Sequence, residues 1–135
     1  MYTGRVRHVF LVIAFLLFAP TVRPFAGIDE TAPLVTLRIQ PALQLSTPGA
    51  VAYRIAILPH RDNYWFCMGW DNTTTLKGRT SCQQLNGIYS PRVVYQEYTA
   101  LTAGCYDGFV DLYRTPHYRA ASATQRFRVG GVPCV

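Results

Sequence analysis

The chain has 135 residues, a hydrophobic share of 50% and a formal charge of +6. Its basic residues are scattered and form no stripe, so we expect no nucleic-acid partner. We expect Arg5, Arg7 and Arg23 to be removed with an N-terminal export signal, which would leave the rest of the chain near +3. About 109 residues then remain, which suffices for one modest domain with a single core.

The N-terminus has the order of a signal peptide. A short basic head precedes the uncharged run 9–19, which is shorter than the about 20 apolar residues needed to span a bilayer core. A polar stretch broken by prolines follows, and the best cleavage site lies after Ala26. We therefore predict a signal peptide at 1–26, a loose leader at 27–33 and a secreted or periplasmic location without membrane contact after cleavage. An uncleaved membrane anchor and a buried N-terminal helix are the alternatives.

The remainder of the chain has the period of β-strands. Apolar and polar residues alternate, which places one face of a strand on a core and the other in water. Turn residues separate the alternating runs. Short strands at this spacing predict an all-β chain in which residues 34–135 form one antiparallel β-sandwich of about seven strands. The clearest alternating runs are 35–40, 51–57, 105–113 and 126–129.

The segment from Leu101 to Tyr106 gives the sharpest indication of the fold. Gly104 allows a tight entry into the next strand, and Tyr106 is expected to bury its ring and turn its hydroxyl to nearby backbone, as tyrosine corners do. With this pattern the chain resembles immunoglobulin-like domains, most closely the bacterial immunoglobulin-like and polycystic-kidney-disease-type modules of secreted proteins. The resemblance implies an immunoglobulin-like β-sandwich with the aromatic segment 63–71 as its third strand. The chain departs from antibody-type domains because residues 51–58 contain no cysteine.

The four cysteines are expected to form disulfides, because an even number of thiols follows an export signal. Facing residues of an antiparallel hairpin lie about 4.5–5.5 Å apart, which suits a disulfide. Two predicted hairpins bring Cys67 opposite Cys82 and Cys105 opposite Cys134, and these are the pairs that we predict. The rival pair, Cys67–Cys105, stays open. The spacing contains no C-x-x-C pair and no cysteine–histidine cluster, so we expect no metal and no cofactor.

Two groups of polar residues are candidate sites of catalysis. His60, Asp62 and Asn63 lie in one turn, where they are either a metal or acid–base site or, in our preferred interpretation, a polar turn that bonds its own backbone. Asp107 and Asp111 share a strand face but are about 13 Å apart, which is too wide for a glycosidase pair. No nucleophile motif is present, so we expect that the chain is not an enzyme.

The sequence Asn72-Thr73-Thr74 matches a glycosylation sequon at a predicted turn. It has meaning only in a eukaryotic secretory pathway. The bacterial character of the resemblance favours a chance match.

The aromatic strand provides the candidate binding residues, which are Tyr64, Trp65, Phe66 and Trp70. Its rings occupy both faces, and both can be buried only if something covers the outer one. The rings either form a stacking platform or fill the core and cover sheet edges. We expect a non-catalytic structural or protein-interaction module whose partner is an extracellular or periplasmic protein or glycan. The alternative is a carbohydrate-binding module that uses this strand face.

Overall fold

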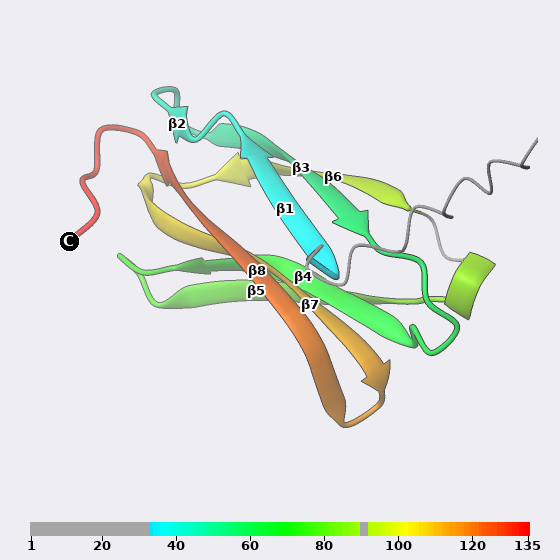
Figure 1. The fold of residues 1–135 in the computed structure, drawn as a ribbon. Helices are drawn as coiled ribbons and strands as arrows, with labels where there is room; N and C mark the ends of the chain where they lie inside the picture. Colours follow the sequence, from blue (N-terminus) through cyan, green and yellow to red (C-terminus); the bar gives the residue numbers. More distant parts are fainter. Residues whose placement is uncertain (1–32, 90–91) are drawn as a thin grey trace, which may run out of the picture. The chain divides into compact units, whose positions relative to one another are not determined.

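The computed structural model describes residues 33–89 and 92–135, which form eight strands in two sheets (Figure 1). No α-helix occurs in these ranges, so the chain is all-β as its alternation predicts. The predicted signal peptide at 1–26 lies outside the described residues, as does nearly all of the predicted leader. Within the described ranges, no helix has the length and apolar character needed to cross a membrane.

The smaller sheet has three antiparallel strands in the order β1 (Val35–Gln40), β3 (Gly49–Ile57) and β6 (Val93–Leu101). A single 3₁₀ turn, η1 (Gly87–Tyr89), precedes β6. The central strand shows why these residues form a sheet, since its side chains alternate between core and surface. Its buried residues include Val51, Tyr53, Ile55 and Ile57.

The larger sheet has five strands in the order β2 (Leu43–Gln44), β8 (Tyr118–Val129), β7 (Gly104–Thr115), β4 (Trp65–Asn72) and β5 (Lys77–Gln84). β2 pairs parallel to β8, and all other neighbours are antiparallel. β5 is therefore an edge strand with β4 as its one neighbour, and all eight of its residues are exposed.

A connected series of aromatic rings fills the space between the two sheets. Tyr106 stacks on Phe127 with ring centroids 4.9 Å apart, and Trp70 meets the Tyr106 ring edge-on at 5.2 Å. Tyr53 then contacts Phe127 at 6.4 Å and Tyr98 at 4.9 Å. Such pairs contribute about 0.5–1.5 kcal/mol each beyond the burial of their area. The series crosses from β4 to β6 and so joins the two sheets.

The corner before β7 has the geometry that its sequence predicts. The ring of Tyr106 is 1% exposed, and its hydroxyl donates a hydrogen bond of 2.6 Å to the carbonyl of Thr102. A glycine is required at position 104 because a Cβ there would lie 2.8 Å from the side-chain amide of Asn72. The glycine therefore makes room for the asparagine.

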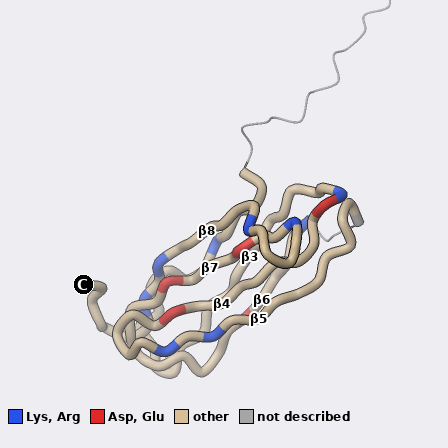
Figure 2. The backbone as a smooth tube through the Cα atoms, turned by 90° about the horizontal axis from the view of Figure 1, so that it is seen from below, with Lys and Arg blue, Asp and Glu red and all other residues tan. Residues whose placement is uncertain are grey.

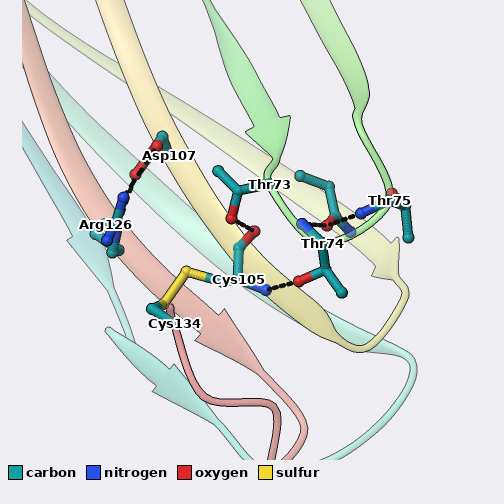
Figure 3. The surroundings of a disulfide bond; sticks show 8 residues. Thr73, Thr74, Thr75, Cys105, Asp107, Arg126 and Cys134 are labelled. Carbon is teal, nitrogen blue, oxygen red and sulfur yellow. Dashed lines mark hydrogen bonds and ion pairs between the residues drawn. A yellow bond between two sulfur atoms is a disulfide. The ribbon is translucent and has the colours of Figure 1, made fainter.

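Two disulfides join Cys67 to Cys82 and Cys105 to Cys134, the pairs that the hairpin argument gives. The first links directly opposed residues of β4 and β5, whose Cα atoms are 4.0 Å apart. The second does not link two paired strands as predicted, because β8 ends at Val129 and Cys134 lies on the tail beyond it. This second disulfide fastens the tail to β7 (Figure 3).

The turn between β4 and β5 is fixed by side chains. Asn72 is 2% exposed, and its Oδ1 accepts hydrogen bonds of 2.9 and 3.1 Å from the backbone N–H groups of Thr74 and Thr75. Thr73 donates to the carbonyl of Cys105 through its N–H and its hydroxyl, at 2.8 and 3.0 Å. The Cys105 N–H in turn donates to Thr74 Oγ1 at 3.0 Å (Figure 3). The asparagine of the sequon therefore organises this turn.

We expect Asn72→Ala to lower the free energy of unfolding by about 2 kcal/mol, because it leaves two backbone N–H groups without their acceptor. Denaturant unfolding of the oxidised protein measures the change. Thr80→Ala, at an exposed position of β5, is the matched control and should be close to neutral. Equal stability of the two variants would show that the turn does not depend on Asn72.

Stability should also fall in alkaline solution because of Tyr53. This phenol is fully buried and donates to the carbonyl of Gly69 at 2.9 Å; burial, followed by the nearby Tyr98 and Asp71, raises its pKa well above the ordinary value. The neutral phenol stabilises the folded protein in full below about pH 10, the pKa of tyrosine in the unfolded chain. This contribution is lost as the pH rises above that value.

The free energy of unfolding should fall with pH by at most about 1.4 kcal/mol per pH unit because of this one group. Urea unfolding between pH 7 and 11 measures the slope, which should be shallower in Tyr53→Phe than in the unmodified protein. Tyr118→Phe, at a residue that is 63% exposed, should leave it unchanged. An equal slope in all three proteins would contradict the assignment.

Candidate functional site

A cavity of about 610 Å³ opens between the edge strands β5 and β6 and is called the β5–β6 cavity below. Its volume falls in the range of small-molecule sites, about 300–1,000 Å³. The end of β4 and the segment before β7 complete its walls. The residues that matter most in its lining are Trp70, Lys77, Arg79, Tyr98, Ala100 and Tyr106.

Strand register brings two cations to this cavity. Arg79 lies opposite Trp70 and Lys77 lies opposite Asn72, so both basic residues share the face of the larger sheet that carries the core. The guanidinium carbon of Arg79 lies 5.7 Å from the ring centroid of Tyr98, which is cation–π geometry. Neither Lys77 nor Arg79 forms an ion pair within the described part of the chain. Their charge therefore faces the cavity without an acidic counterpart.

Two buried hydrogen-bond donors belong to the same lining. Trp70 Nε1 and the Tyr98 hydroxyl have no hydrogen-bond partner among the described residues, and Tyr98 is 3% exposed. Burial raises the pKa of Tyr98, while Ser81 and the charge of Arg79 act in the opposite direction. The Ser81 hydroxyl nevertheless does not reach hydrogen-bonding geometry with the phenol. At neutral pH the phenol is a neutral donor.

Such unpaired donors are costly, since each buried polar group without a partner costs about 1–3 kcal/mol. Both donors belong to residues that line the cavity. Other unpaired buried atoms of the described chain, Trp65 Nε1 among them, belong to residues that do not line this cavity.

The backbone around the cavity is strained at two places. Leu76 and Ala100 are the non-glycine residues of the described chain with positive φ, at 59° and 55°. Ala100 lines the cavity, and Leu76 lies between two lining residues, Thr75 and Lys77. The register of β3 and β6 also shifts next to Ala100, which marks a β-bulge. Bulges and strained residues concentrate at binding sites, where they aim neighbouring groups.

The two faces of the larger sheet differ in their charged side chains. On its outer face Arg126 donates to Asp107 at 2.9 Å, and Asp111 accepts from Ser122 at 2.6 Å and lies 3.7 Å from Arg119. In the β5–β6 cavity, by contrast, no described lining residue is acidic. Figure 2 shows basic positions in blue along the sheet edge and acidic positions in red on neighbouring strands. No acidic residue of the described lining therefore compensates the charges of Lys77 and Arg79.

The four predicted binding residues do not lie together. Phe66 is fully buried in the core, and Trp70 contacts Tyr106 beside the cavity. Trp65 lies on the other face of β4, where its ring meets Tyr113, and it contacts the ring of Tyr64, just before the strand, at 4.9 Å. Only Trp70 of the four lines the β5–β6 cavity.

Sequence reasoning missed Lys77, Arg79 and Tyr98. The available signal was the pair of basic residues two positions apart, which places both on one face of a strand. Nothing local to that pair indicates that β6 and its tyrosine lie beside it.

The turn at His60 bonds mainly to backbone. The Asp62 N–H donates to His60 Nδ1 at 3.1 Å, and the side-chain amide of Asn63 donates to the carbonyl of Leu58 at 3.0 Å. These contacts favour the interpretation of a polar turn. In residues 33–89 and 92–135, no group of three or more His, Cys, Asp or Glu side chains could hold a metal ion.

Comparison with known proteins gives a limited result. Neither a protein-family profile nor a curated protein sequence matches this chain. A superoxide reductase (neelaredoxin) from Ignicoccus hospitalis is similar in structure, with a TM-score of 0.47 and 9% identity over 73% of this chain and 80% of that one. Two variants of it match with TM-scores of 0.46 and 0.47 and 11% identity. They cover 73% and 74% of this chain, and 80% and 82% of theirs.

These matches correct the sequence interpretation in three respects. They are superoxide reductases, so they contradict the resemblance to bacterial immunoglobulin-like and polycystic-kidney-disease-type modules. Because the matched proteins are named as enzymes, they also contradict the expectation that the chain is not an enzyme. The expectation of a non-catalytic structural or protein-interaction module, with a carbohydrate-binding module as its alternative, is contradicted with it.

The physical reason is that alternating strands and a tyrosine corner report a sandwich architecture, which unrelated families share. The matched proteins are only 9–11% identical to this chain, and no chemistry is transferred from them to it.

The strain at Ala100 can be measured. We expect Ala100→Gly to raise the free energy of unfolding by about 0.5–1 kcal/mol, because relief of a left-handed alanine exceeds the entropy cost of glycine. Ala52→Gly, at an exposed position of β3, should lower it by a similar amount. Denaturant unfolding of both variants provides the comparison. Destabilisation by both would show that Ala100 is not strained.

Proposed function

We propose that the β5–β6 cavity binds a small organic anion. The observation that carries this proposal is the convergence of two cations and two unpaired buried donors on one cavity without a described acidic residue. Carboxylates and related anions accept hydrogen bonds from both kinds of group. Bonds from charged donors are about twice as strong as neutral ones.

The residues of the cavity have distinct roles in this proposal. Arg79 presents a planar fork that suits a bidentate contact with a carboxylate, and its stacking on Tyr98 limits its freedom before the ligand arrives. Lys77 adds a point charge at the rim. Trp70 Nε1 and the Tyr98 hydroxyl are the unpaired neutral donors of residues that line the cavity.

The size and apolar character of the cavity favour an anion with an organic body. A volume of about 610 Å³ exceeds what a lone inorganic anion fills. The rings of Trp70, Tyr98 and Tyr106 give the rest of the ligand an aromatic surface to pack on.

We further propose that the two sheets have an immunoglobulin-like strand arrangement and that the protein acts in a secreted or periplasmic location. The bond from the Tyr106 hydroxyl to Thr102 supports the first point, since a tyrosine corner is typical of such sandwiches. Two disulfides in a small domain support the second.

Calorimetric titration with naphthalene-2-carboxylate tests the binding proposal, and the neutral naphthalene-2-carboxamide is the matched ligand control. Arg79→Gln should weaken carboxylate binding by about 1.5–3 kcal/mol, the range for a hydrogen bond to a charged group. It should change carboxamide binding little. Arg126→Gln, which alters an exposed ion pair on the outer face, should bind the carboxylate as the unmodified protein does.

Three outcomes would overturn the proposal. These are equal affinity for the carboxylate and the carboxamide, equal losses in Arg79→Gln and Arg126→Gln, and no carboxylate binding at all. Inorganic phosphate binding as tight as the carboxylate would contradict the organic body of the ligand.

A further inference from the structure

The strand that carries the two cations has little to hold it. β5 pairs with β4 alone, and its eight residues are all exposed, so core packing does not fix it. Edge strands of this kind open locally at lower free energy than central strands. The positions of Lys77 and Arg79 therefore depend on the few restraints that tie β5 to β4.

One of these restraints is covalent. The Cys67–Cys82 disulfide joins β4 to β5 three residue pairs from the pair formed by Trp70 and Arg79. Cys82 lies three positions after Arg79 in the strand, so the two side chains point to opposite faces: the disulfide lies on the outer face while Arg79 faces the cavity. The disulfide thus restrains the strand without touching the ligand site.

The two disulfides differ in access. Cys82 is exposed and Cys67 is 9% exposed, whereas Cys134 is half-buried and Cys105 is 2% exposed. Exposed disulfides are the ones that thiols reduce first, because attack needs access to a sulfur atom.

We infer that the redox state of Cys67–Cys82 controls the affinity of the β5–β6 cavity for its anionic ligand, an inference that rests on the proposed function. A thiolate of a dithiol reductant attacks the sulfur of Cys82 and displaces the Cys67 thiolate. The second thiol of the reductant then resolves the mixed disulfide. The cystine gains two electrons and two protons, and the dithiol becomes a disulfide.

Reduction lowers affinity through the edge strand. Without the covalent link, the backbone ladder to β4 alone holds β5 between Arg79 and the end of the strand. The turn at Asn72 still fixes the start of β5, and Leu85, which is buried and donates to the Tyr64 carbonyl at 2.8 Å, still fixes the segment after it. Fraying of this strand removes Arg79 from Tyr98 for part of the time. The core and the remaining strands keep their contacts.

The test begins with graded reduction of the full oxidised protein by dithiothreitol, followed by N-ethylmaleimide and peptide mapping. Cys67 and Cys82 should be alkylated before Cys105 and Cys134. Protein with only the first disulfide opened should bind naphthalene-2-carboxylate about tenfold more weakly, the loss of one charge-assisted hydrogen bond. The double variant Cys67→Ser/Cys82→Ser should show the same loss and no further response to dithiothreitol.

Hydrogen exchange gives a readout that does not need the ligand. Amide protection should fall in β5 on reduction and stay unchanged in β7 and β8. Equal affinity of the oxidised and reduced proteins, or equal protection of β5 in both, overturns the inference while the proposed function stands. Absence of binding by the oxidised protein overturns the proposed function itself, and loss of protection throughout the chain would show global unfolding in place of local control.

Discussion

Three hydrogen bonds between the backbone of Cys105 and the residues Thr73 and Thr74 determine where the edge of the larger sheet begins. β5 has one neighbouring strand and contributes nothing to the core, so its start is placed by this turn. Cys105 is itself held by its disulfide to Cys134, which makes a remote crosslink part of the support of the cavity. The two basic side chains follow directly from the turn, and their aim depends on it.

The cavity has several features that lower the stability of the fold and that a purely structural sheet edge would not need. Two buried donors lack partners, and an alanine in the left-handed region sits at a bulge of the facing strand. Folding tolerates these costs because the aromatic series from Trp70 to Tyr98 ties the walls of the cavity to the centre of the core. A rigid wall with unmet hydrogen-bonding capacity is a preorganised site, which binds without first having to order its own groups.

Local patterns in the sequence predicted the architecture well. Alternation predicted the strands, and the segment before Tyr106 predicted the corner because its contact spans only four residues. The cavity could not be predicted in this way, since Arg79 and Tyr98 meet only when the β5 edge lies beside β6. The aromatic strand shows the same limit. Phe66 and Trp70 share a face as alternation requires, but only the packing of the second sheet decides that one is core and the other lines an opening.

The exposure of β5 has a consequence for how this protein can change over generations. Substitutions at surface positions away from special contacts usually alter stability by less than about 0.5 kcal/mol. Lys77 and Arg79 belong to this exposed strand, whereas other lining residues such as Tyr106 are buried in the core. Ligand preference can therefore drift through residues 77 and 79 while the scaffold stays intact. Related chains would then share the buried rings that line the cavity and differ in the charged residues at positions 77 and 79.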